Sequence, residues 1–264
     1  MIALCFFVTT NRLHQEQLWM EQINKFKNKI NIYVHWKKST VTKPSEFIKK
    51  YALPTTEIVN TSYFNMVPAY LSTLRYAMLS DDNNQYFFLL TESCIPVKSF
   101  DVILNTLRQL PKNSSIMRWS HANWNVDMHR RANLRLLPEK YHLRNDPWFM
   151  LSREHAMHVF EFRTKLYETY RLICQGDIAN ESFFAIALCT SPKISNDIIN
   201  ETCNAADWSR MTSPTSPYVF HSPLSENDKR FINMCKYDPY VFFIRKVDNE
   251  DELREELTRL LYKN

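Results

Sequence analysis

The chain has 264 residues, 45% of them hydrophobic, and a formal net charge of +5. Its length allows one large core or two small ones. Its single glycine excludes the glycine-rich loops by which P-loop and dinucleotide-binding proteins hold phosphates, so any nucleotide has to be held by other groups.

The sequence has no run of about 18 or more apolar residues, and Met1 leads almost directly into a strand-like segment with no signal peptide. We therefore expect a soluble, cytoplasmic protein. The six cysteines form no CxxC pair, and several lie within apolar runs. This favours buried free thiols over disulfides, as expected in a reducing compartment.

Basic residues are locally in excess in the middle of the chain. They are His129, Arg130, Arg131, Arg135, Lys140 and Arg144. Such a patch can hold nucleic acid, a diphosphate or an acidic sugar, although a solvated face is the commoner outcome. We expect no nucleic-acid partner.

Strands alternate with helices through the first 110 residues. Strands are predicted over 2–8, 30–34, 57–59 and 86–90, and helices over 16–26, 44–51, 67–79 and 99–110. This alternation predicts an α/β fold with a mostly parallel sheet and helices on both faces.

The second half is less regular. Strands are predicted over 148–151 and 241–244. Helices are predicted over 153–169, over 181–188 with Asp177 or Asn180 as cap, from the cap Ser225 to about 236, and at the carboxyl terminus. The loop at 213–223 is too short to separate two cores. We expect a single domain over residues 1–264.

The apolar strand that begins at Tyr86 ends in Thr91, Glu92 and Ser93. In an open α/β sheet, ligands bind just past the carboxyl ends of such strands. These three residues are therefore candidates for a binding site.

Several segments, taken in chain order, carry a resemblance to a known family. They are Leu18-Trp19, Ile32-Tyr33-Val34-His35, Phe87-Phe88-Leu89-Leu90-Thr91-Glu92-Ser93-Cys94-Ile95-Pro96, Trp148-Phe149, Arg153-Glu154-His155-Ala156, Ala179-Asn180-Glu181-Ser182-Phe183-Phe184, Asp207-Trp208-Ser209 and Phe243-Ile244-Arg245-Lys246. The chain resembles, nearly end to end, the core-2/I-branching glycosyltransferases of family 14, especially their plant-type relatives. The segment from Phe87 to Pro96 is the most specific.

The resemblance implies a GT-A-type, Rossmann-like fold and an inverting sugar transfer without a metal ion. It implies a nucleotide-sugar-binding half over 1–120 and an acceptor and catalytic half over 121–264. The donor is expected to be a UDP-sugar, with xylose or N-acetylglucosamine as the sugar, and the acceptor a glycan hydroxyl. Family members are typically Golgi proteins with an amino-terminal anchor, so the Golgi lumen is the alternative location if an anchor was removed.

An inverting transfer needs a carboxylate as general base for the acceptor hydroxyl. Glu181 leads an apolar helix, whose positive amino terminus should keep the carboxylate ionised. The resemblance makes Glu181 the catalytic base. An ordinary carboxylate in the first turn of a helix is the alternative.

The departing diphosphate needs positive charge. Thr91-Glu92-Ser93 offers one carboxylate, a poor site for Mg²⁺ or Mn²⁺, so side chains have to supply this charge. The resemblance points to Lys246, and Arg245 and Arg210 are further candidates. A metal-dependent transferase using Glu92 with Asp81 or Asp82 is disfavoured, because these aspartates precede the strand.

The other candidate contacts follow from position and resemblance. Nucleoside and donor-sugar contacts are assigned to Val8, Thr9, His35, Thr91, Glu92 and Ser93, and acceptor contacts to Trp148, Arg144 and Trp208. Two residues depart from the family pattern: Asn180 replaces an aspartate before the base, and Lys37 replaces a uridine-binding aspartate of the animal enzymes. Asn180 leaves open a second function, a catalytically retired glycan-binding module.

Overall fold

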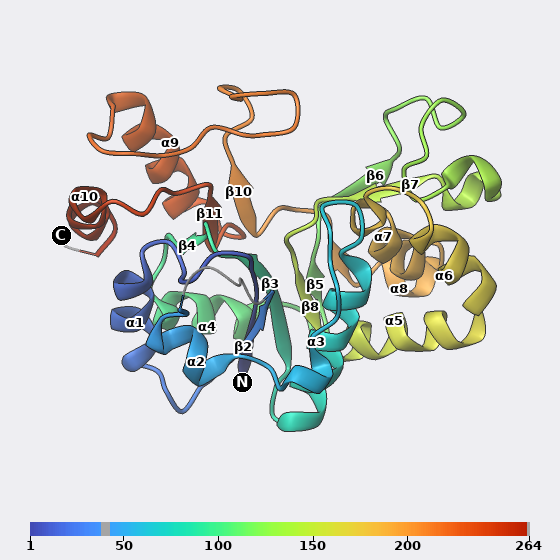
Figure 1. Ribbon diagram of the computed structural model, residues 1–264, viewed down its shortest axis with the longest axis horizontal. Coiled ribbons are helices and arrows are strands. Elements are labelled where there is room, and N and C mark those ends of the chain that lie inside the picture. Colours follow the sequence, from blue (N-terminus) through green and yellow to red (C-terminus); the bar gives the residue numbers. More distant parts are fainter. Residues whose placement is uncertain (38–42, 263–264) are drawn as a thin grey trace.

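A computed structural model describes residues 1–37 and 43–262. Its main sheet has six strands in the order β2-β1-β3-β8-β5-β9, and helices cover both faces (Figure 1). The six strands are β1 (Ile2–Val8), β2 (Ile30–Trp36), β3 (Tyr86–Thr91), β5 (Ser115–Ile116), β8 (Met150–Ser152) and β9 (Ile198–Ile199). Strand β8 is antiparallel to both of its neighbours, and the other pairings are parallel. The predicted α/β class and mostly parallel sheet are confirmed.

All seven residues of strand β1 are buried, so the whole strand lies within the core. Such a continuous apolar strand suits a parallel sheet that is covered on both faces. Ala3, Cys5 and Phe7 face a core cluster with α3 (Val67–Ser80), α5 (Arg153–Lys165) and α7 (Phe183–Cys189). Leu4 and Phe6 face a second cluster with α1 (Glu16–Asn24), α2 (Glu46–Tyr51) and α4 (Phe100–Gln109).

Two smaller sheets extend this frame. Strand β11 (Phe243–Arg245) lies between β10 (Asn204–Ala206) and β4 (Ile95–Pro96), and β6 (Trp119–His121) pairs with β7 (Leu143–Asn145). A third core cluster joins Ile95 and Val97 to α9 (Glu226–Tyr237) and α10 (Asp251–Tyr262). The remaining helices are α6 (Tyr167–Cys174), α8 (Pro192–Ser195) and the 3-10 turns η1 (Thr55–Glu57), η2 (Leu134–Leu136), η3 (Glu139–Tyr141) and η4 (Ala179–Glu181).

The structure also bears on the predicted helix cap at Ser225 and on the predicted state of the cysteines. Ser225 caps α9 through a capping box with Asp228, as predicted. All six cysteines are free and four are buried, which confirms the predicted thiols. Within residues 1–37 and 43–262, no helix is both long and apolar enough to cross a bilayer.

The predicted strand over 57–59 is wrong. The N–H groups of Glu57 and Ile58 bond within a 3-10 turn, and that of Val59 donates to the His35 imidazole. No N–H group is therefore left for a neighbouring strand. The helix predicted over 153–169 is also interrupted, since Leu166 leaves helical geometry between α5 and α6.

The helix predicted from Glu181 begins later than expected. Glu181 is the last residue of η4, and α7 starts at Phe183. Its N-cap is Ser182, which makes no side-chain capping bond, so neither Asp177 nor Asn180 caps it. Helical periodicity in the sequence could not distinguish the 3-10 turn from the first turn of α7.

Candidate active site

The carboxyl ends of β1, β2 and β3 meet at one edge of the main sheet, where Phe7 pairs with both His35 and Thr91. Strand β8 runs the other way, so Trp148, just before it, lies at this same edge. Strands β5 and β9 point in the direction of β3, and the segments that follow them reach the edge too. This is the edge at which open α/β sheets bind ligands.

Thr9 and the loop after β3 form a polar group at this edge. Thr9 donates to a carboxylate oxygen of Glu92 at 2.7 Å. The backbone N–H of Ser93 donates to Thr91 Oγ1 at 3.1 Å, and the two hydroxyl oxygens lie 3.2 Å apart. The structure therefore brings together four of the residues predicted to contact the donor.

Val8 and His35 have structural partners within the fold. The Val8 carbonyl accepts the N–H of Lys37 at 3.0 Å. His35 Nε2 accepts the N–H of Val59 at 3.1 Å, which assigns its proton to Nδ1, and burial lowers the pKa of this histidine. His35 is therefore a neutral ring inside β2. Lys37 stands where the animal enzymes are expected to have a uridine-binding aspartate. Its ammonium donates to the Thr61 carbonyl at 2.8 Å.

Arg245 and Lys246 reach the same edge from β11, because the N–H of Val247 donates to the Ser93 carbonyl at 3.0 Å. The Arg245 guanidinium lies 5.6 Å from the centre of the Trp148 ring. Lys246 Nζ lies 3.4 Å from Ser216 Oγ. Burial and the nearby Arg245 lower the pKa of Lys246, while Glu92 opposes that effect. Two cations and an indole are therefore held beside the loop of Glu92.

Arg210 is paired with two carboxylates. Its guanidinium bonds Asp207 at 2.7 Å and Asp228 at 2.8 Å, and both carboxylates are buried. It also stacks 3.9 Å from the centre of the Tyr218 ring. In this arrangement Arg210 links the segment after β10 to α9. Trp208, on the same segment, is 49% exposed.

Glu181 lies close to several arginines. Its Oε2 is 3.6 Å from a guanidinium nitrogen of Arg131, and one third of its side chain is exposed. Burial raises the pKa of Glu181, Asp146 raises it further, and Arg131, Arg144 and Arg245 lower it. The predicted position of Glu181 in the first turn of the helix is wrong, because α7 begins at Phe183, and burial is the largest influence on its pKa.

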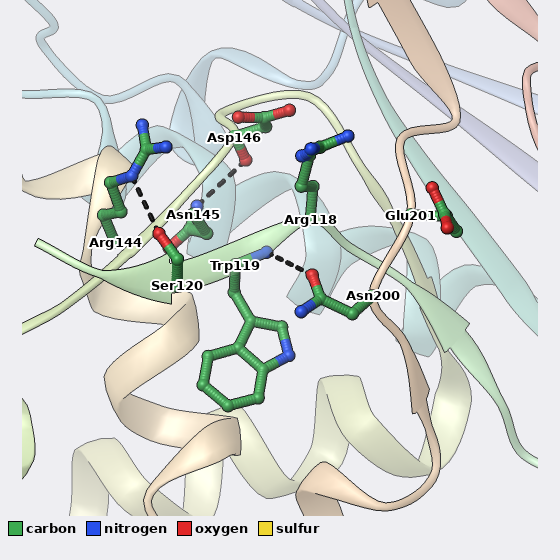
Figure 2. A pocket seen from close by; sticks show the side chains of 8 residues that line it. All are labelled: Arg118, Trp119, Ser120, Arg144, Asn145, Asp146, Asn200 and Glu201. Atoms are coloured by element: carbon green, nitrogen blue, oxygen red, sulfur yellow. Dashed lines mark hydrogen bonds between the residues drawn. The ribbon is translucent and has the colours of Figure 1, made fainter. Parts of the chain in front are cut away.

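A pocket of about 210 Å³ has Arg118 and Arg144 in its wall (Figure 2). It is lined by Arg118, Trp119, Ser120, Arg144, Asn145, Asp146, Asn200 and Glu201. Arg144 donates to Ser120 Oγ at 2.9 Å, and the N–H of Trp119 donates to the Asn200 side chain at 2.8 Å. Burial raises the pKa of Asp146, and Arg144, Arg118 and Arg245 oppose that rise.

Asn145 connects this pocket to Glu181. Its amide donates to the carbonyl of Asn180 at 2.9 Å, and its side-chain oxygen accepts the N–H of Ala185 in α7 at 3.0 Å. The pocket wall therefore holds both the turn that ends in Glu181 and the helix that follows it.

Comparison with known families shows to which family this protein belongs. The sequence model of the Core-2/I-Branching enzyme family matches residues 2–238. The chain belongs to the core-2/I-branching enzyme family. Members of this family are glycosyltransferases, and the suspected resemblance is confirmed. A search of curated proteins found no match. The matched residues include Thr91, Trp148 and Glu181 and end before Arg245.

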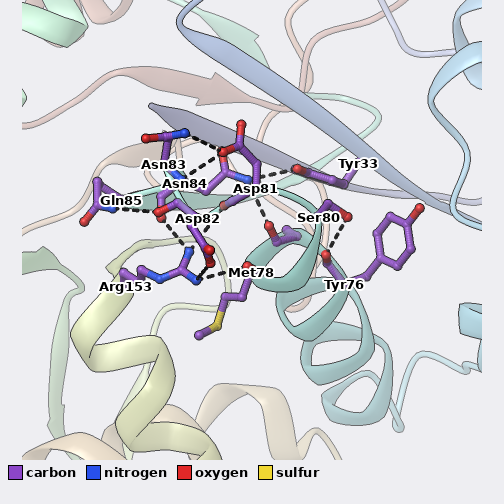
Figure 3. A network of polar contacts seen from close by, with 11 residues as sticks. Tyr33, Tyr76, Met78, Ser80, Asp81, Asp82, Asn83, Asn84, Gln85 and Arg153 are labelled. Carbon is purple, nitrogen blue, oxygen red and sulfur yellow. Dashed lines mark hydrogen bonds and ion pairs between the residues drawn. The ribbon is translucent and has the colours of Figure 1, made fainter.

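In this core-2/I-branching enzyme, Asp81 and Asp82 are too far from Glu92 to form the metal site considered above. Asp81 accepts a bond from Asn31, and Asp82 pairs with Arg153, near the amino end of β3 (Figure 3). Glu92 follows the carboxyl end of the same strand. The two aspartates therefore cannot share a metal with Glu92. No cluster of three or more His, Cys, Asp or Glu side chains suited to a metal occurs in 1–37 or 43–262.

Four residues close to the site of this enzyme were not found from the sequence. Arg118 and Asn200 follow two-residue strands, which are too short to give a periodic signal. Asn145 acts through its contacts with distant backbone groups. Arg131 was visible only as part of a basic segment.

Proposed function

We propose that this enzyme transfers a sugar, with xylose or N-acetylglucosamine as the first candidates, from a UDP-sugar to a glycan hydroxyl with inversion and without a metal. One observation carries the proposal. Glu181 lies beside the pocket at the ligand-binding edge of the sheet, because Asn145 of the pocket wall bonds the carbonyl of Asn180 just before it, and Arg245 lies against Trp148 at the same edge. A candidate base and candidate leaving-group cations thus share one site.

The proposed reaction is a single in-line displacement. The acceptor oxygen attacks the anomeric carbon as Glu181 takes its proton, and the bond to the diphosphate breaks with its electron pair leaving on UDP. Negative charge grows on the diphosphate, and Lys246 and Arg245 would stabilise it. Burial and, to a lesser extent, Arg245 lower the pKa of Lys246, and a bound diphosphate would offset both effects.

The donor and acceptor would occupy neighbouring parts of the edge. Thr9, Glu92 and the hydroxyls of Thr91 and Ser93 provide hydrogen-bonding groups for the donor. Acceptor binding is proposed for the pocket that contains Arg144 and for Trp148, whose ring lies against Arg245. A tryptophan ring suits the apolar face of a sugar, and the surrounding polar groups suit its hydroxyls.

A donor screen tests this function. The protein would be incubated with a panel of UDP-sugars and glycan acceptors, and released UDP and the product linkage would be measured. We expect one donor to give acceptor-dependent UDP release and a product of inverted anomeric configuration. A product that retains the donor configuration would exclude the single displacement.

The retired glycan-binding module remains the second candidate, because Asn180 lacks the charge of the usual aspartate. Acceptor glycans that bind in calorimetry without turnover of any UDP-sugar would favour it.

A further inference from the structure

The single glycine of the chain marks a point where two backbone segments touch. A Cβ added to Gly176 would lie 2.2 Å from the backbone nitrogen of Asn133 and 2.5 Å from the carbonyl carbon of Ala132. The N–H of Ala132 donates to the Asp177 carbonyl at 2.8 Å, and the N–H of Asp177 donates to the Arg130 carbonyl at 2.9 Å. Gly176 is thus required for space at this crossing.

The crossing places Arg131 against Glu181, which lies fifty residues further along the chain. Ala132 and Asn133 have positive φ angles of 48° and 51°, so the chain turns sharply just after Arg131. The guanidinium of Arg131 then lies 3.6 Å from Glu181 Oε2 and 5.0 Å from the centre of the Trp124 ring. Contact with an aromatic face holds a guanidinium in place without neutralising it.

We propose that Arg131 is a positioning residue that keeps the Glu181 carboxylate ionised and oriented for its work as the base. This inference rests on the proposed function, in which Glu181 deprotonates the acceptor. The closest approach is to Oε2 and, at 3.6 Å, is longer than a hydrogen bond. A contact of this length leaves the carboxylate free to accept a hydrogen bond from the acceptor hydroxyl.

The other charges around Glu181 do not replace Arg131. Burial and Asp146 disfavour the ionised carboxylate, while Arg131, Arg144 and Arg245 favour it, Arg131 most strongly. Arg144 is also engaged with Ser120, and Arg245 lies against Trp148. In residues 1–37 and 43–262, the ion pair of Glu181 is with Arg131. Removal of Arg131 should therefore raise the pKa of Glu181 and reduce its ionised fraction near neutral pH.

The decisive experiment measures the titration of Glu181 without relying on catalysis. Protein labelled with ¹³C at the glutamate side-chain carboxyl would be titrated by NMR, with Glu181→Gln used to identify the signal. We expect Arg131→Met to move the Glu181 midpoint to higher pH and Arg131→Lys to move it less. Arg130→Met is the matched control, because it removes the same charge from an exposed neighbour and should leave the midpoint in place.

Equal midpoints in the wild type and Arg131→Met would overturn the proposal, and so would an equal shift in Arg130→Met. If Arg131→Met does not fold, Arg131→Gln provides the same comparison with a polar side chain. Once a donor is known, the acid limb of the kcat/KM profile should move in the direction of the midpoint. A shifted midpoint in a protein that turns over no donor would refute the proposed function while supporting the coupling.

Gly176→Ala tests the crossing itself. Its Cβ would push the backbone at 132–133 away, so we expect the same upward shift of the Glu181 midpoint as in Arg131→Met. The double variant Gly176→Ala, Arg131→Met should shift no further than Arg131→Met alone, because both changes break the same contact. Fully additive shifts, or a Gly176→Ala midpoint equal to that of the wild type, would show that the crossing does not position Arg131.

Discussion

At the scale of single residues, the site places two carboxylates in different surroundings. Glu181 and Asp146 both have a raised pKa because of burial, but Glu181 has an ion pair with Arg131 and remains one third exposed. A base near its working pH gains strength from a moderately raised pKa, provided that it stays ionised. Glu181 was predicted from its motif, whereas its electrostatic partners depend on contacts between distant segments.

Glu181→Gln should abolish transfer while leaving UDP binding nearly intact, because the substitution removes only the base. Loss of a general base costs roughly 10²–10⁴ in rate. Turnover at saturating substrate and calorimetric UDP affinity would be compared with those of Glu139→Gln, a change at an exposed glutamate. If Glu181→Gln keeps more than about half of wild-type turnover, another residue must deprotonate the acceptor.

Lys246→Ala should weaken the binding of UDP and UDP-sugar and lower turnover, with little effect on the fold. The ammonium would face a diphosphate whose charge grows as the donor bond breaks, so its effect should be larger in the transition state. Lys193→Ala removes an exposed lysine from α8 and serves as the control. Unchanged UDP affinity in folded Lys246→Ala would assign the leaving-group role to Arg245 or Arg210.

At the scale of elements, long buried strands were predictable and short ones were not. Strands β1 and β3 are runs of apolar residues covered on both faces, which gives a strong signal. Strands β5 and β9 have two residues each and form through pairing with β8 and with each other. The segments that follow them line the pocket, so that part of the site could not be located from the sequence.

The segment after β10 provides a test of stability. Arg210→Met would leave the buried carboxylates of Asp207 and Asp228 without their cation, a change that typically costs about 3 kcal/mol. We expect a lower Tm, together with UDP affinity close to that of the wild type in the folded variant. A large loss of UDP affinity with an unchanged Tm would instead place Arg210 at the diphosphate.

The same residues predict a pH dependence. Burial raises the pKa of Asp207 and of Asp228, but hydrogen bonds from neighbouring residues, Arg210 among them, outweigh it and lower both pKa values. A lowered carboxyl pKa contributes stability that is present above the unfolded value and is lost as pH falls through the folded value. The Tm difference between wild type and Arg210→Met should therefore shrink below about pH 4. A constant difference down to pH 2 would contradict this coupling.

At the scale of the whole molecule, the site draws on residues from Thr9 to Lys246. The core clusters cross the two predicted halves: Phe242 and Phe243 pack with β1, and α10 packs with Ile95 and Val97. The family match ends at residue 238, yet β11 beyond it supplies Arg245 and the link to Ser93. The metal-free character of the reaction was inferred from the single carboxylate after β3 and stays a prediction.

Activity should therefore survive EDTA. The loop after β3 offers Glu92 alone, and its carboxylate accepts a hydrogen bond from Thr9, whereas Mg²⁺ or Mn²⁺ needs several oxygen ligands. Lys246 and Arg245 would supply the charge instead. UDP release by the identified donor would be measured in excess EDTA, with a known metal-dependent transferase treated in parallel. Full loss of activity that Mn²⁺ restores would show that a divalent ion stabilises the leaving group.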